Sequence, residues 1–256
     1  MLYYRLYKHK TSQEYVTFIH GAGGSSSIWF KQIRAFKEKY NLVLIDLRGH
    51  GKSKKSFIEK IKSYSFKVVS DDVVEVLNHL KIQSTHFIGI SLGTIIIREI
   101  AERFPDKVKS MVLGGAIMKM NFRGQLLMRL GDTFKSVLPY MLLYRFFAFV
   151  ILPRKNHRHS RSIFVNEAKK LDQYEFKKWF SLVAEVNPLL KFFRGTEVAL
   201  PTLYIMGEQD HMFLPSIQKI TQLHKNSQLA IIPNCGHVVN IEQADLFNEK
   251  AIAFIG

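Results

Sequence analysis

The sequence has little cysteine, few acidic residues and no long apolar run. Cys235 is the only cysteine, so no intramolecular disulfide can form, and we expect it to be a buried packing residue. The most apolar stretch, Val137–Leu152, is broken by Pro139 and Arg145 and is shorter than the ~20 residues of a bilayer-spanning helix. Residues 1–7 alternate like an edge strand and lack the charged start and cleavage site of a signal peptide. We therefore expect no transmembrane helix and, by default, a cytoplasmic location.

The scarcity of acidic residues makes the chain strongly basic. It has 37 Lys and Arg against 21 Asp and Glu, a net charge of +16. This charge permits nucleic-acid binding, but no recognition motif, zinc-ligand spacing or RNA-binding aromatic signature is present, so we do not expect it. A metal site is not expected either. The pair His157 and His159 has no carboxylate or cysteine nearby and is flanked by cations that oppose a metal ion, so we predict a solvated loop there.

The pentapeptide Gly89-Ile90-Ser91-Leu92-Gly93 places a serine between two glycines. The run Thr85–Ile90 is apolar and β-branched, as in a buried strand, and Leu92–Phe104 has the composition and length of a helix. A serine in this strand-to-helix turn takes a strained backbone conformation, and its hydroxyl is held at the carboxyl edge of the sheet above a helix N-terminus. The pattern predicts a nucleophile elbow with Ser91 as the nucleophile, although G-x-S-x-G also occurs in ordinary turns.

A glycine-rich loop, His20-Gly21-Ala22-Gly23-Gly24, follows a strand predicted at Glu14–Ile19. Acyl transfer passes through a tetrahedral intermediate whose negative oxygen needs two preorganised donors. We expect the N–H groups of Ala22 and Leu92 to be these donors, and His20 to hold the loop. A tight turn that binds nothing is the alternative interpretation.

An acid and a histidine each follow a short apolar strand late in the chain. Pro201–Met206 leads into Asp210, and Leu229–Pro233 leads into His237. A helix expected at Ser216–His224 would complete a right-handed β-α-β unit and bring the two loops side by side at the carboxyl edge of the sheet. The order along the chain is then nucleophile, acid, base.

With these motifs in this order along the chain, the sequence resembles the α/β-hydrolase superfamily. Trp29 after the glycine-rich loop and the segment Asp46–Ser53 (Asp-Leu-Arg-Gly-His-Gly-Lys-Ser) belong to the same pattern. The resemblance implies an α/β fold with a mostly parallel central sheet and helices on both faces. It also implies roles for single residues: nucleophile Ser91, acid Asp210, base His237, oxyanion donors Ala22 and Leu92, and structural roles for Asp46 and His50.

The alternation of strands and helices is interrupted between the strand predicted at Val108–Leu113 and the one that begins at Pro201. We therefore divide the chain into a core in two parts, 1–115 and 196–256, and an inserted helical cap, 116–195. The cap is expected to lie over the active site and to shape its pocket. Apolar residues recur at helical spacing in several parts of the cap, around Gly124–Leu130, Asp132–Tyr144 and Phe164–Val186.

The cap is both basic and aromatic. From Ala116 to Gly195 the chain has 15 Lys and Arg against 5 Asp and Glu, a net charge of +10, and 14 of its 32 Phe, Tyr and Trp residues. Three interpretations stay open. In the first, the aromatic residues fill the cap and line an acyl pocket, and the basic residues form a solvated face. In the second, the cap binds an anionic membrane. In the third it binds nucleic acid, for which no motif is present.

These residues predict a serine hydrolase that cleaves carboxylic esters with an apolar acyl group, a carboxylesterase or small lipase. His237 takes the proton of Ser91 as it attacks the acyl carbon, Asp210 holds the imidazole tautomer, and the loop amides bind the oxyanion. No metal or organic cofactor is required, and the expected partner is a small-molecule ester. Two alternatives use the same fold: a carbon-carbon bond hydrolase or lyase, and a non-hydrolytic receptor that keeps the triad for ligand capture.

Overall fold

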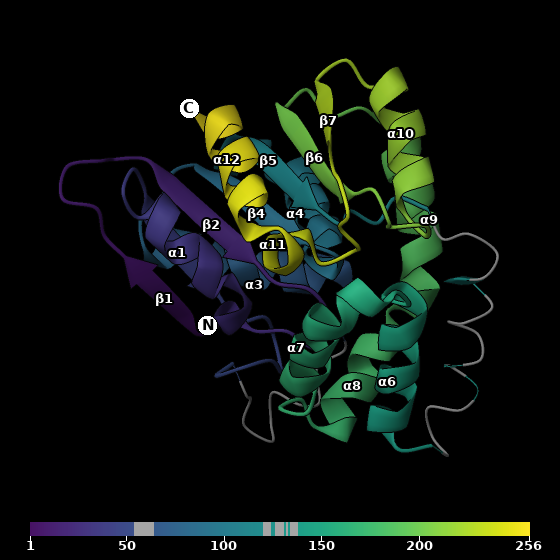
Figure 1. Cartoon of the computed structure of the whole chain (residues 1–256). Coiled ribbons are helices and arrows are strands. Elements are labelled where there is room, and N and C mark those ends of the chain that lie inside the picture. Colours follow the sequence, from purple (N-terminus) through teal and green to yellow (C-terminus); the bar gives the residue numbers. More distant parts are fainter. Residues whose placement is uncertain (54–63, 120–123, 126–130, 132, 134–137) are drawn as a thin grey trace.

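A seven-stranded sheet forms the centre of the molecule (Figure 1). The computed structural model describes residues 1–53, 64–119, 124, 125, 131, 133 and 138–256. Strand order is β1-β3-β2-β4-β5-β6-β7; β1 is antiparallel to β3 and the other neighbouring pairs are parallel, which confirms the predicted mostly parallel sheet. The strands are β1 (Tyr4–Tyr7), β2 (Tyr15–Ile19), β3 (Asn41–Ile45), β4 (Thr85–Ile90), β5 (Val108–Gly114), β6 (Thr202–Gly207) and β7 (Ser227–Ile232).

Helices cover both faces of this sheet, as predicted. Residues of η1, α1, α11 and α12 pack on one face, and residues of α3, α4 and α10 pack on the other. The predicted bounds of β2, β4, β5, β6 and β7 and of α4 and α10 agree with the structure to within two residues, whereas the edge strand expected in residues 1–7 begins only at Tyr4. The helices of the core are η1 (Ser26–Trp29), α1 (Phe30–Phe36), α3 (Phe66–His79), α4 (Leu92–Arg103), η2 (Pro105–Lys107), α10 (Leu214–Leu223), α11 (Val239–Glu242) and α12 (Ala244–Ile255).

Strand residues alternate between the two faces. In β3, Leu42 and Leu44 belong to the same buried cluster as Trp29, whereas Val43 and Ile45 belong to the cluster that contains α3 and α4. Because helices cover both faces, the consecutive residues Leu42 to Ile45 of β3 are all apolar and buried. The sequence therefore shows the core strands as short unbroken apolar runs rather than as an apolar-polar alternation.

The described part of the cap consists of helices between β5 and β6, in the region where the sequence interrupts the alternation. Figure 1 shows α6, α7 and α8 grouped together beyond one end of the sheet. Most of the predicted helical segment Gly124–Leu130, and most of residues 132–137, lie outside the described residues. The cap helices are α6 (Tyr140–Ile151), η3 (Lys155–His157), α7 (Arg158–Ala168), α8 (Gln173–Ser181) and α9 (Val183–Gly195).

Two helices of the cap, α6 and α8, start directly after a proline and an aspartate rather than where the apolar spacing predicts. α6 begins directly after Pro139, whose φ of −56° and missing N–H suit the start of a helix, so it lies mostly beyond the predicted segment Asp132–Tyr144. The predicted segment Phe164–Val186 is divided between several helices. A new helix, α8, starts after Asp172, whose carboxylate accepts a 2.8 Å hydrogen bond from the N–H of Glu175.

The cap has a small apolar core of its own and is fastened to loops of the main core. The indole N–H of Trp179 donates to the carbonyl of Arg48 at 2.9 Å, and the hydroxyl of Ser25 donates to the carboxylate of Glu167 at 2.9 Å. None of the described helices is long and apolar enough to cross a membrane. The buried residues of the cap core are Leu143, Tyr144, Ala168, Leu171, Phe176 and Phe180.

Candidate active site

Ser91 lies in the turn between β4 and α4 with a strained backbone. Its φ is 54° and its ψ is −120°, a region that non-glycine residues rarely occupy. The two flanking glycines allow the close packing that the turn needs. A Cβ atom on Gly93 would lie 2.3 Å from the carbonyl oxygen of Ile19, and one on Gly89 would lie 2.5 Å from Cδ1 of Ile97. The structure thus has the strand-turn-helix geometry that the motif predicts.

The side chains of Ser91, His237 and Asp210 form one hydrogen-bonded chain. His237 Nε2 lies 2.9 Å from Ser91 Oγ, and His237 Nδ1 lies 2.7 Å from Asp210 Oδ2. The other carboxylate oxygen of Asp210 accepts a 3.2 Å hydrogen bond from the N–H of Phe213, whose ring packs beside the imidazole. Both Asp210 and His237 are buried. When Nδ1–H donates to the carboxylate, the lone pair of Nε2 faces the serine hydroxyl and is placed to accept its proton.

Backbone hydrogen bonds join the two loops that carry Asp210 and His237. The N–H of Gln209 donates to the carbonyl of Cys235 at 2.8 Å. A Cβ atom on Gly207 would lie 2.0 Å from the carbonyl oxygen of Gly236, so a side chain there would block this approach. Since β6 and β7 are parallel neighbours connected by α10, the predicted β-α-β unit is present and explains how residues far apart in sequence meet.

Both predicted oxyanion donors border the cavity that reaches the serine. Leu92 is the first residue of α4, so its N–H has no acceptor within the helix. The loop that carries Ala22 is held by the buried ring of His20. Nδ1–H of that ring donates to the carbonyl of Gly21 at 2.7 Å, and Nε2 accepts from the N–H of Leu47 at 2.9 Å. His20 therefore holds the loop, as the sequence analysis expects.

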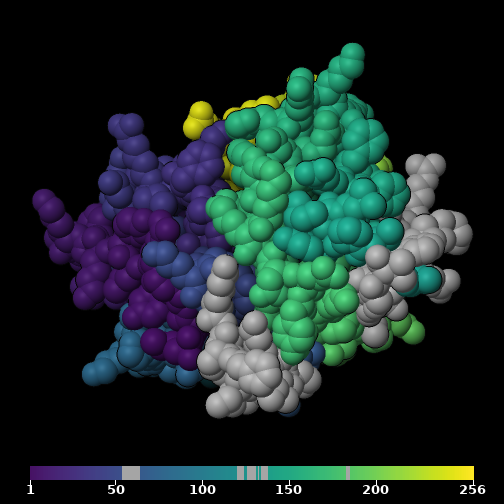
Figure 2. Space-filling view, turned by 90° about the horizontal axis from the view of Figure 1, so that it is seen from below, coloured from purple at the N-terminus to yellow at the C-terminus, as the bar shows by residue number. Residues whose placement is uncertain are grey.

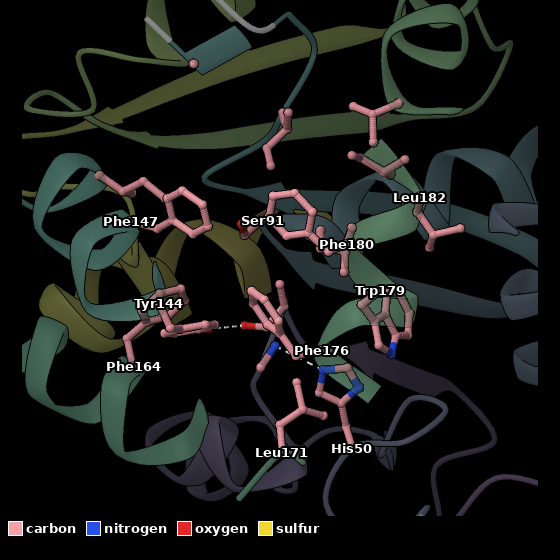
Figure 3. Close-up of a pocket in the computed structure, with 18 of the residues that line it drawn as sticks. His50, Ser91, Tyr144, Phe147, Phe164, Leu171, Phe176, Trp179, Phe180 and Leu182 are labelled. Carbon is pink, nitrogen blue, oxygen red and sulfur yellow. Dashed lines mark hydrogen bonds between the residues drawn. The ribbon is translucent and has the colours of Figure 1, made fainter. Parts of the chain in front are cut away.

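The Ala22–Gly23 peptide is held at both ends (Figure 3). Its carbonyl oxygen accepts a 2.6 Å hydrogen bond from the hydroxyl of Tyr144, and its N–H donates to His50 Nε2 at 3.0 Å. The other nitrogen of His50 donates to the carbonyl of Arg48 at 3.0 Å. Burial lowers the pKa of His50 to about 3 and raises the pKa of Tyr144, so the histidine stays a neutral acceptor and the tyrosine stays a donor.

The contact of Tyr144 with this loop is not indicated by the sequence. Tyr144 lies in an apolar stretch of the cap, where it could equally be a packing residue, and it is far in sequence from the loop that it meets. Only the folded arrangement of α6 over the loop reveals the hydrogen bond.

Asp46 ties the start of η1 to the loop that follows β3. Its carboxylate accepts hydrogen bonds from the N–H of Ser26 at 2.6 Å and from the N–H of Lys52 at 2.8 Å. A Cβ atom on Gly51 would lie 2.2 Å from the same carboxylate. Asp46 thus has the structural place that the resemblance implies.

An apolar cavity of about 190 Å³ opens beside Ser91 between the core and the cap. Figure 3 shows aromatic side chains of α6, α7 and α8 around it. Among the described residues that line it, no side chain is Lys, Arg, Asp or Glu. A smaller cavity of about 30 Å³ also borders Ser91 and His237. Apolar residues that line the larger cavity include Phe66, Ile95, Phe147, Phe164, Phe180 and Met212.

His157 corrects one sequence-based expectation. It is fully buried rather than solvated, and its Nε2 lies 2.8 Å from the amide oxygen of Gln209 and 3.7 Å from the carboxylate of Glu242. It therefore fastens the cap to the loop that carries Asp210. His159 is exposed, as predicted, but it lies in α7 and not in a loop. No group of three or more His, Cys, Asp or Glu side chains in the described part of the chain could hold a metal ion.

Cys235 has the packing role predicted for it. Its side chain is fully buried, and burial raises the pKa of the thiol, which keeps it protonated. A protonated, buried thiol is a poor nucleophile.

Comparison with known proteins agrees with this geometry. A family model for the alpha/beta hydrolase fold matches residues 15–135. A putative carbamate hydrolase, RutD of Acinetobacter baylyi, is 26% identical over 98% of this chain and 97% of its own length. An uncharacterized carboxylesterase, nap of Bacillus subtilis, is 24% identical over 93% of this chain and 78% of its own length. The structure of MenH from S. aureus superposes with a TM-score of 0.85 at 20% identity, covering 100% of this chain and 98% of that one.

The sheet order, the elbow and these matches define the class of protein. The chain has the α/β-hydrolase fold, and the matched family model and the names of its relatives support an enzyme of the hydrolase class. The relatives share hydrolase and esterase names but differ in the substrates that those names indicate.

Proposed function

We propose that the chain is a carboxylic ester hydrolase for substrates with an apolar acyl group. The observation that carries this proposal is the hydrogen-bonded chain Ser91–His237–Asp210 at the edge of an apolar cavity. We also propose that residues 116–195 act as a cap over the active site, because residues of this segment form much of the wall of that cavity.

In the proposed reaction, Ser91 Oγ attacks the acyl carbon of the ester and its proton passes to His237 Nε2. The N–H groups of Ala22 and Leu92 bind the negative oxygen of the tetrahedral intermediate. His237 then gives the proton to the leaving alcohol, which leaves an acyl-enzyme on Ser91. Water, deprotonated by the same imidazole, attacks the acyl carbon and releases the carboxylic acid and the free serine. Asp210 keeps the imidazole in the tautomer that these proton transfers need.

The lining of the larger cavity favours an apolar acyl group. A carboxylate on the acyl chain would be removed from water there, and the described lining offers no Lys or Arg side chain to pair with it. An alkyl or aromatic group loses no hydrogen bonds on entry and gains from its removal from water.

A series of p-nitrophenyl esters of increasing acyl length tests this substrate class. Each methylene buried in the cavity contributes about 0.8 kcal/mol, so we expect kcat/KM to rise roughly fourfold per methylene until the cavity is full. A matched ester whose acyl chain ends in a carboxylate is the control and should react far more slowly. Equal rates for the two esters, or a preference for acetate over longer chains, would contradict the proposed substrate class.

The hydroxyl of Tyr144 should affect turnover more than substrate binding. If it keeps the Ala22 loop in position, Tyr144→Phe should lower kcat for a short soluble ester by about tenfold, less than the ~10²-fold that follows direct removal of an oxyanion donor, and leave KM nearly unchanged. Tyr140→Phe is the matched control, since its hydroxyl donates to the carbonyl of Leu171 within the cap at 2.6 Å. An unchanged kcat in Tyr144→Phe, or equal losses in both variants, would exclude this positioning role.

A further inference from the structure

The outer face of α6 exposes large apolar side chains to solvent. Leu142, Phe146 and Phe149 are 54%, 51% and 56% exposed. They are spaced at i, i+4 and i+7, which places them on one face of the helix, and Arg145 lies on the same face and is also exposed. Isolated exposed apolar residues are common on proteins, but a row of them along one helix marks an interaction surface.

The opposite face of the same helix borders the substrate cavity. Tyr144, Phe147 and Ile151, again spaced like one helical face, line the cavity that reaches Ser91. α6 is therefore a single layer between the cavity and the exposed apolar row.

The chain next to this apolar row is basic. From Leu138 to Asn166 the sequence has five cationic residues and no Asp or Glu. The guanidinium of Arg161 lies 5.4 Å from the ring centre of Phe149, so the cations and the apolar row are contiguous. Arg145, Arg154, Lys155 and Arg158 are exposed, and no described residue forms an ion pair with them.

We propose that the outer face of α6 and the cations that follow it, together called the docking face, bind an anionic lipid membrane. Cations are attracted to anionic headgroups while Phe and Leu side chains enter the boundary with the acyl chains, which is the behaviour of interfacial helices. A second copy of the chain fits this face poorly, because symmetric pairing would bring two sets of cations together. Figure 2 shows the teal and green atoms of the cap as one continuous surface beside the N-terminal part of the core.

This docking would give an apolar substrate a short way into the site. A substrate dissolved in the membrane would then be separated from the cavity only by the layer that α6 forms. That consequence rests on the proposed ester hydrolysis, whereas membrane binding itself does not, so binding is measured on the Ser91→Ala variant as well as on the parent chain.

Co-sedimentation with phosphatidylglycerol vesicles and with phosphatidylcholine vesicles tests the proposal. The parent chain should sediment with the anionic vesicles only, and its binding should weaken as salt is raised beyond 0.1 M, where charges act over about 10 Å. Changing Arg145, Arg154, Lys155 and Arg158 to Gln should weaken binding by roughly fivefold for each cation removed. Arg161 is kept in this variant because its guanidinium also donates to the carbonyl of Leu152.

Matched variants distinguish binding by the docking face from the effects of net charge and of exposed apolar residues elsewhere on the protein. Lys8, Lys10, Lys37 and Lys39, all exposed on the core, are changed to Gln to give the same loss of charge and should bind nearly as well as the parent chain. For the apolar row, Phe146→Ser with Phe149→Ser should weaken binding at least tenfold. Phe30→Ser, which removes a Phe that is 53% exposed on α1, should leave binding unchanged.

Three results would overturn the proposal: no binding to anionic vesicles at low salt, equal losses in the docking-face and core-lysine variants, or a stable dimer in solution that Phe146→Ser dissociates. All docking-face and control variants that keep Ser91 should hydrolyse a short soluble ester like the parent chain, which shows that they are folded. If the parent chain bound the vesicles but hydrolysed no ester, the result would contradict the proposed function and still support membrane binding by the docking face.

Discussion

The Ser91→Ala variant is expected to lose ester hydrolysis by about 10⁶-fold in kcat, as when the nucleophile of a serine protease is removed. The reason is that Ser91 Oγ is the atom that His237 Nε2 contacts, at 2.9 Å, beside the substrate cavity. Alanine keeps the positive φ and most of the volume of the residue, so the fold should persist. Measured kcat for a p-nitrophenyl ester and labelling by a fluorophosphonate probe give the result.

Cys235→Ala is the control for this variant. Cys235 lies close to His237 in sequence but is fully buried, so its removal should keep both labelling and turnover. Labelling that survives in Ser91→Ala and disappears in Cys235→Ala would assign the nucleophile to the cysteine and contradict the proposed mechanism.

Asp210→Asn is expected to lower kcat by about 10⁴-fold while the protein stays folded. Asp210 Oδ2 lies 2.7 Å from His237 Nδ1, and an amide there can present its NH₂ group, which favours the tautomer with the proton on Nε2. In that tautomer Nε2 faces Ser91 as a donor and can no longer take its proton. Single-turnover kinetics and a thermal melt of the variant separate the loss of rate from a loss of stability.

Glu208→Gln is the matched control, because Glu208 is the nearest other carboxylate along the loop. It is exposed, and its carboxylate accepts a 3.1 Å hydrogen bond from the N–H of Asn234. We expect a change in kcat of less than about tenfold in this variant. If Asp210→Asn also lost less than tenfold, another group would have to orient the imidazole.

The core and the hydrogen-bonded triad could be predicted because their signals are local. Each core strand is a short apolar run, and each triad residue lies in the loop that follows one such run. The parallel sheet therefore brings Ser91, Asp210 and His237 to one edge. The strain at Ser91 was also predictable, since a strand-to-helix turn leaves few backbone conformations to a residue between two close-packed glycines.

The contacts between cap and core could not be predicted because their partners are far apart in sequence. Tyr144 meets the carbonyl of Ala22, and His157 meets Gln209, through the packing of whole helices. For His157 the flanking cations suggested a solvated loop, but the ring alone turns inward and is buried. Local charge does not determine the direction of a single side chain at a helix start.

The sequence also does not predict which face of α6 lines the cavity and which face is exposed. Its sequence is apolar almost all round, so no amphipathic pattern distinguishes the residues that line the cavity from those that face solvent. Only the position of the helix over the core separates Phe147 from Phe146. The strong positive charge of the cap was visible in the sequence, but its continuity with an exposed apolar row was not.

The most direct test of the central claim is to locate the covalent adduct. The parent chain is labelled with a fluorophosphonate, digested, and its peptides are analysed by tandem mass spectrometry. We predict one added phosphonyl group per chain, attached to Ser91, and no adduct when Asp210 and His237 are both replaced by alanine under the same conditions. An adduct on Cys235, on another serine, or on no residue of the active parent chain would contradict an acyl-enzyme on Ser91.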